Sequence, residues 1–205
     1  MTDAADTPEN EDDENAPTPG WDAIDAALTA LYPDQEPVHF GTALPMSLGG
    51  DDPLNGISVY KNLVPVPHFH FITYGFSELF DKEFDEPEIS GFGFELTFRL
   101  ACAADDTDPP DWVIDFLQNL ARYIFSTGNP LGQNHYVDLR GPISLDHKTE
   151  ITCVAVAADP QLGEFNSPNG RAEFLQLVGI CSDEYELVQD WDCSRMLQEL
   201  AKVTP

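Results

Sequence analysis

Residues 92–100 alternate strictly between apolar and other side chains, and this run constrains the fold more than any other part of the sequence. Successive side chains of a β-strand point to opposite faces, so one face is apolar while Glu95 and Thr97 lie on the other. This pattern predicts one buried and one wetter face, as in an antiparallel or mixed sheet. Gly91 and Gly93 indicate a bulge or a close backbone approach. The apolar positions are Phe92, Phe94, Leu96, Phe98 and Leu100.

Two segments carry the three- and four-residue spacing of amphipathic helices. The first begins at Gly20 and ends before Pro33. The second follows Asp111, which is placed to cap it, and ends at Gly128. The apolar positions that carry the two patterns are Ile24, Ala27, Leu28 and Leu31 in the first helix, and Trp112, Phe116, Leu120 and Ile124 in the second.

The remaining elements complete an α+β pattern. Further strands are expected at 57–61, 68–75, 151–157 and 172–180, and helical segments at 183–189 and 192–202. Between them, the sequence predicts loops, including the irregular stretch 131–149. Strands and helices do not alternate regularly, which favours a mixed, largely antiparallel central sheet flanked by helices. Residues 1–19 are acidic and proline-containing, so we expect a disordered leader followed by one domain over 20–205.

The formal net charge of −28 excludes several classes of partner. Such a surface repels phosphate backbones and anionic membranes, so we expect no nucleic acid or membrane partner. Three explanations of the acidity stay open. The chain can be adapted to a salty cytoplasm, it can bind a basic protein, or it can simply be well solubilised.

The cysteines and the apolar runs predict a cytoplasmic protein. The four cysteines form no C-x-x-C pair, which favours reduced thiols. The N-terminus lacks the apolar core of a signal peptide. The longest near-continuous apolar stretch, 151–158, is far shorter than the ~20 residues of a membrane span.

No motif predicts a catalytic residue, a metal or a cofactor. Ser58 follows the start of a G-x-S-x-G pattern, but the second glycine of a nucleophile elbow is missing. His68 and His70 lie two apart on a strand and therefore share a face, where they can pack beside Phe69 and Phe71. The alternative hypothesis is a hydrolase-type enzyme of unrecognised class, which uses one of these imidazoles with a nearby carboxylate.

An ordered set of segments resembles the N-terminal domain of the Suppressor of fused family. It covers about residues 20–200, and the ordered set is specific although each segment alone is weak. Among the segments are GWDAI at 20–24, LGGDDPL at 48–54, HFHFI at 68–72, SGFGFELTFRL at 90–100, LARYIF at 120–125 and FLQLVGIC at 174–181.

The resemblance implies a non-enzymatic domain that binds a protein or peptide. The animal family member is a two-domain regulator that sequesters a transcription factor and adds a short peptide of it as a strand. Single-domain bacterial relatives imply another role, that of an immunity protein that neutralises a toxin, and the acidity would suit a basic toxin. A third reading is a regulatory domain whose acidity reflects salt adaptation.

The resemblance also places the partner-binding side at one acidic loop. The implied residues are Phe80, Asp81, Asp85, Glu86 and Glu88. A merely solvated acidic loop is the alternative at these positions.

Overall fold

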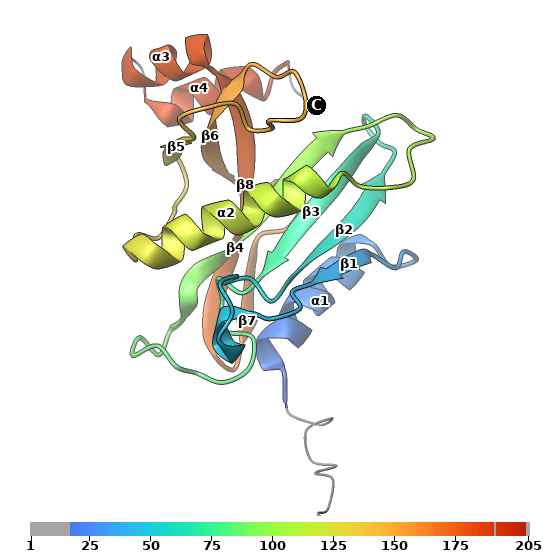
Figure 1. Cartoon of the computed structure of the whole chain (residues 1–205). Coiled ribbons are helices and arrows are strands. Elements are labelled where there is room, and N and C mark those ends of the chain that lie inside the picture. The colour runs from blue at the N-terminus through green and yellow to red at the C-terminus, as the bar shows by residue number, and fades with distance from the viewer. Residues whose placement is uncertain (1–16, 191, 204–205) are drawn as a thin grey trace, which may run out of the picture.

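The computed structural model describes residues 17–190 and 192–203 and forms the α+β fold of Figure 1. Most of the predicted leader lies outside the described residues, but Pro19 opens the first helix. The helices are α1 (Pro19–Leu31), the short 3₁₀ helix η2 (Met46–Leu48), α2 (Asp111–Thr127), α3 (Ser182–Asp190) and α4 (Cys193–Leu200). The strands are β1 (Val38–Gly41), β2 (Gly56–Asn62), β3 (His68–Tyr74), β4 (Ile89–Ala101), β5 (Tyr136–Asp138), β6 (Ile151–Ala158), β7 (Glu164–Ser167) and β8 (Gly170–Cys181).

The eight strands form one sheet in the order β1-β2-β3-β4-β8-β6-β5, and β7 pairs with β8 beside this path. Only the β4–β8 pair is parallel, and every other pair is antiparallel. The prediction of a mixed, largely antiparallel sheet is therefore confirmed. The parallel pair needs a long crossover, which here contains α2 and the three strands β5, β6 and β7.

Helices cover both faces of the sheet. Phe71 packs in the large cluster that contains the buried side chains of α2. Its neighbour Ile72 belongs to the second cluster, with Ile24 and Leu28 of α1. Since adjacent strand residues point to opposite faces, α1 and α2 lie on opposite sides of the sheet. Figure 1 shows α2 crossing the near face, while α3 and α4 pack at the end of the sheet where β8 ends and β6 begins.

The prediction that one face of β4 is wetter is wrong for the centre of the strand. Glu95 and Thr97 are both 0% exposed, because the face opposite α2 is covered as well. The predicted bulge is confirmed by a register shift between Ile89 and Phe94. Gly91 has a φ of 56°, and a Cβ there would lie 2.4 Å from the carbonyl oxygen of Phe76. Only glycine fits this close approach.

Two smaller expectations also need correction. Asp111 does not cap α2, because Pro110 occupies the N-cap position and no side chain caps the helix there. Asp111 instead lies in the first turn, where a carboxylate still complements the helix dipole. The short strands β1, β5 and β7 lie in segments predicted to be loops.

Candidate functional site

All five predicted partner-binding residues lie in the connection between β3 and β4. Phe80 is 44% exposed, although phenylalanine is usually buried. Asp81, Asp85, Glu86 and Glu88 are also exposed. Within the described part of the chain, no side-chain hydrogen bond or ion pair joins the five residues to one another. These four carboxylates and the ring of Phe80 are therefore open to solvent.

The side chain of Glu78 accepts several hydrogen bonds from this loop. Its Oε1 accepts hydrogen bonds from the backbone N–H groups of Glu83 and Phe84, the latter at 2.6 Å. Its Oε2 accepts from the Nζ of Lys82 at 2.8 Å and from the N–H of Gly91 at 3.1 Å. Burial alone would raise the pKa of Glu78, but these hydrogen bonds outweigh it and hold the pKa below its usual value. One carboxylate thus ties the middle of the loop to the start of β4.

Asn169 anchors the start of the same loop to the β7–β8 turn. Its side-chain amide donates to the carbonyl oxygens of Glu78 and Phe80, both at 2.9 Å. The far end is anchored by the N–H of Arg171, which donates to the carbonyl oxygen of Glu88 at 2.9 Å. A loop tied at both ends loses little conformational entropy when it binds a partner, so its geometry is preorganised.

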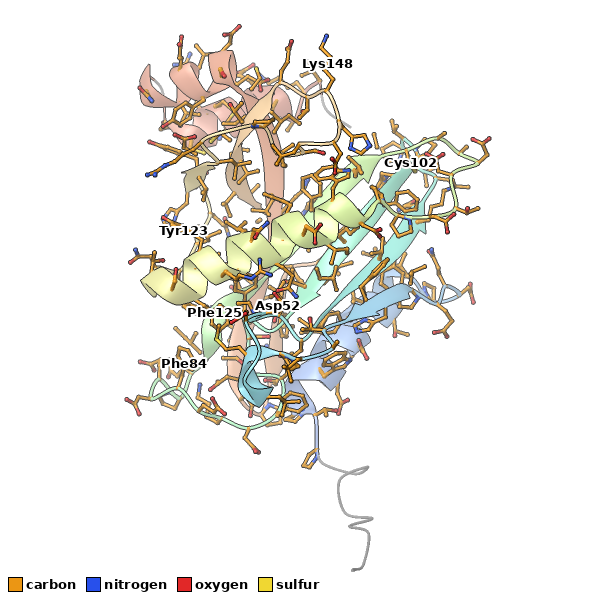
Figure 2. All side chains as sticks on the ribbon, viewed as in Figure 1. Asp52, Phe84, Cys102, Tyr123, Phe125 and Lys148 are labelled. Atoms are coloured by element: carbon orange, nitrogen blue, oxygen red, sulfur yellow. The ribbon has the colours of Figure 1, made fainter. Side chains whose placement is uncertain are left out.

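Phe84 extends the exposed apolar surface, and the sequence reasoning missed it. Its ring is 46% exposed and lies 5.8 Å from that of Phe92, which in turn lies 4.9 Å from the ring of Phe125. Figure 2 shows Phe84 on the loop and Phe125 on α2. An isolated phenylalanine inside an acidic run was the signal that could have found it.

A hollow of about 630 Å³ lies beside Phe125. Met46 and Asp51 form one side of it, and Arg122 and Ser126 the other. Arg122 also pairs with Asp52, which ties α2 to the segment after η2. The aromatic row from Phe84 therefore ends at a concave surface with both apolar and charged walls.

The two histidines of β3 contact other groups of the protein. His70 is 0% exposed, and its Nδ1 lies 2.8 Å from the hydroxyl of Tyr32. Its Nε2 lies 3.5 Å from the Oδ2 of Asp159. Burial lowers the pKa of His70 to about 4, against the raising effect of the hydrogen bond to Asp159, so the ring is neutral at pH 7. His68 is half-buried, with its Nδ1 2.7 Å from the carbonyl oxygen of Val66.

Asp159 is the centre of this polar network. The guanidinium of Arg99 donates to its two carboxylate oxygens at 2.7 and 3.1 Å, and the hydroxyl of Thr97 donates at 2.6 Å. Burial would raise the pKa of Asp159, but the hydrogen bonds from His70 and Arg99 hold it well below its usual range. The network joins β3 and β4 to the loop after β6 and leaves no carboxylate oxygen free for a substrate.

No group of three or more His, Cys, Asp and Glu side chains in the described residues is placed to hold a metal ion. No helix within the described ranges is long and apolar enough to cross a membrane. Fold and site together define an α+β domain whose candidate site is a preorganised acidic loop on the surface.

Comparisons with known proteins identify the family. The family model for the Suppressor of fused protein (SUFU) matches residues 50–205. The Suppressor of fused homologues of Mus musculus and Homo sapiens are each 36% identical over 197 residues, which cover 90% of this chain and 40% of each relative. The chain belongs to the Suppressor of fused family, and it spans about two fifths of the length of these curated relatives.

Solved structures share the same fold. A chain of the Sufu–Fu complex is 34% identical with a TM-score of 0.83, over 89% of this chain and 84% of that one. Drosophila Suppressor of Fused is 35% identical with a TM-score of 0.83, over 89% of this chain and 46% of that one. A SUFU homologue from Neisseria gonorrhoeae has a TM-score of 0.61 over 91% of both chains at 11% identity, which shows a shared fold alone.

Proposed function

We propose that this chain is a non-enzymatic domain that binds a partner protein through residues 80–88. The observation that carries the proposal is the clamping of this loop by Glu78 and Asn169 while Phe80 and Phe84 remain exposed. Exposed aromatic rings on a rigid surface bury large apolar areas at low entropic cost when a partner binds. A similar chain occurs in the Sufu–Fu complex, which supports a protein partner.

A capture experiment tests the proposal. The 205-residue chain is immobilised and exposed at moderate salt to a lysate of its source organism. We expect one partner in stoichiometric amount, and at least about fivefold weaker capture by Phe80→Ser and Phe84→Ser, because buried aromatic anchors typically contribute more than 1 kcal/mol.

Leu63→Ser is the matched control. Leu63 is also exposed, but it lies at the far end of β2 from the loop. Gly56, at the other end of β2, pairs with Tyr74, the last residue of β3 before the loop. The control variant is expected to capture the partner as the unchanged chain does. Two outcomes would contradict the proposal. In one, only substoichiometric, salt-labile proteins are captured. In the other, the two phenylalanine variants capture the partner as well as the unchanged chain does.

The sharper form of this proposal is an immunity protein whose partner is a basic toxin. It is supported by the net charge of −28 and by the four exposed carboxylates of the loop, which favour a basic surface. Co-expression with the protein encoded beside it tests this form, because an immunity protein restores growth to cells that make the toxin. A captured partner without a basic surface would exclude it.

The hydrolase hypothesis finds little support. His70 has no exposed surface, and both its ring nitrogens face Tyr32 and Asp159. A general base has to reach a substrate proton directly or through one water, which this ring does not. The salt-adaptation hypothesis is independent of the loop and is tested through stability below.

A further inference from the structure

The hollow beside Phe125 lies at the end of the aromatic row that starts on the loop of residues 80–88. Its volume is about 630 Å³, and its lining comes from the C-terminal half of α2 and from the segment around η2. We call it the α2–η2 hollow. Figure 2 shows Phe125 and Asp52 close to each other at α2, with Phe84 on the loop below them. Since the rings of Phe84, Phe92 and Phe125 follow one another, the loop and the hollow form one continuous surface.

The segment around η2 holds apolar side chains out of the core. Leu44, Met46 and Leu48 are 54%, 45% and 71% exposed. Met46 donates its N–H to the carbonyl oxygen of Asp52 at 2.7 Å. The N–H of Leu48 donates to the carbonyl oxygen of Pro45 at 2.9 Å, so the backbone of this segment is closed on itself. Apolar side chains exposed on a backbone of fixed shape typically mark an interaction surface.

The backbone N–H groups of both walls are already paired. Those of Met46, Leu48 and Gly49 have acceptors within the η2 segment, and those in the second half of α2 bond within the helix. An extended segment bound here would leave its own N–H and C=O groups without partners, at a cost in free energy. An α-helix pairs these groups internally and contacts such a surface with its side chains alone.

The charge around the hollow favours a basic partner. Asp51 lines the hollow, and Asp85 and Glu86 are exposed at the loop end of the same surface. Within the described residues, none of these three carboxylates is in an ion pair, whereas Arg122 of the lining is paired with Asp52. A second copy of the chain would bring the same acidic surface and is repelled. A helix of another protein with Lys or Arg beside its apolar face is complementary.

We propose that the α2–η2 hollow, together with Phe84, binds an amphipathic helix of a partner protein that carries Lys or Arg along the borders of its apolar face. The apolar face contacts Met46, Phe84 and Phe125, and the basic side chains face Asp51 and the carboxylates of the loop. The inference rests on the proposed function, because Phe84 belongs to both surfaces, and it names the kind of segment that the partner supplies.

A titration with a designed helix tests the proposal. The probe is a peptide of about 18 residues, or about five helical turns, with leucine at three- and four-residue spacing and lysine and alanine elsewhere. Fluorescence anisotropy of the labelled peptide measures the affinity, and amide chemical shifts of the 205-residue chain locate the site. We expect the shifts to concentrate at 44–52, 83–92 and 119–126. A scrambled peptide of the same composition has no apolar face and should bind at least about tenfold more weakly.

Two leucine-sized positions test the apolar contact. Met46→Ser removes an exposed side chain from the hollow, and we expect it to weaken binding of the helical peptide about fivefold. Leu63→Ser is the matched control, because Leu63 is similarly exposed but lies at the far end of β2. This control should bind the peptide as the unchanged chain does.

Two added lysines test the charge. Ser126 is exposed in the last turn of α2, where a cation complements the helix dipole and leaves the fold intact. Ser126→Lys places a positive charge in the hollow and should weaken binding about twofold to fivefold. Gln198→Lys adds the same charge to α4, at the opposite end of the sheet from the loop (Figure 1), and should leave the affinity unchanged.

Four results would each overturn the proposal. The helical peptide shows no saturable binding, or the shifts centre outside the hollow. The scrambled peptide binds equally well, so no apolar face is recognised. Ser126→Lys and Gln198→Lys weaken binding equally, so only the overall charge attracts the peptide.

Failure of this proposal is distinguishable from failure of the proposed function. The probe is synthetic, so the titration can fail while the capture experiment succeeds. If Phe80→Ser weakens capture of the natural partner and Met46→Ser does not, the loop binds the partner and the helix proposal is overturned.

Discussion

Glu95 places a carboxyl group inside the sheet with no exposed surface. One oxygen accepts from the N–H of Gly75 at 3.0 Å, and from the N–H and hydroxyl of Ser77 at 2.9 and 2.6 Å. The other oxygen lies 2.7 Å from the hydroxyl of Thr73, which also lies 3.3 Å from the carbonyl oxygen of Leu96. A protonated Glu95 can donate to Thr73, which then donates to Leu96. The geometry therefore accommodates the neutral acid.

Replacement of this acid by its neutral isostere gives a prediction about pH. Burial raises the pKa of Glu95 to about 7, against the hydrogen bonds from Ser77 and Gly75 that lower it. A raised folded-state pKa means that the stabilising contribution is complete below about pH 4.5 and is lost as pH rises through 7. We expect the stability of the unchanged protein to fall, relative to Glu95→Gln, by on the order of 3 kcal/mol across this range.

Urea unfolding at several values between pH 5 and 8.5 measures this difference. Because glutamine cannot ionise and can donate to Thr73 in the same way, Glu95→Gln should fold and should lose this part of the pH dependence. Parallel stability curves for the two proteins would contradict the prediction.

At the scale of elements, α2 shows how far a local pattern reaches. Its buried positions are Val113, Phe116, Leu117, Gln118, Leu120, Ala121 and Ile124. The four-residue repeat found Phe116, Leu120 and Ile124 correctly, because helical spacing is a local property. It did not find Leu117 or Gln118, since the width of the buried face depends on the strands that the helix covers. Nor did local pattern reveal β1, β5 and β7, which have four residues or fewer.

Two leucines give a prediction that separates core from surface. Leu117 of α2 is 0% exposed, whereas Leu145 between β5 and β6 is almost fully exposed. We expect Leu117→Ala to lower the free energy of unfolding by about 2–5 kcal/mol, because a cavity remains in the core. Leu145→Ala should change it by less than about 0.5 kcal/mol. Urea denaturation of both variants measures the difference, and a large loss for Leu145→Ala would place that side chain in a packed contact.

At the scale of the whole molecule, the net negative charge acts on the stability of the fold. With 37 acidic and 9 basic side chains, the folded chain repels itself. Added salt screens this repulsion, with a Debye length that falls from about 10 Å at 0.1 M to about 3 Å at 1 M. In the described residues Lys82, Arg99, Arg122, Arg171 and Lys202 form ion pairs with carboxylates, and the acids remain in large excess.

Salt dependence therefore tests the origin of the acidity. We expect the midpoint of thermal unfolding to rise between 0.1 and 1 M sodium chloride, in the absence of any partner. A steep rise that continues at molar salt would favour adaptation to a salty cytoplasm. A midpoint that stays constant would contradict self-repulsion and leave partner binding as the better explanation of the charge.

The sequence by itself determined the elements whose patterns are local and the acidity of the surface. The alternation at 92–100 and the four-residue repeat from Trp112 specify β4 and α2 whatever surrounds them. The acidic loop with Phe80 was also visible, although its role in binding stays a prediction. Only the tertiary structure decided that both faces of β4 are buried, that Glu78 and Asn169 clamp the loop, and that β5 is a free edge. The physical reason is that burial and hydrogen-bond partners come from segments far apart in the chain, and no local spacing encodes which segments meet.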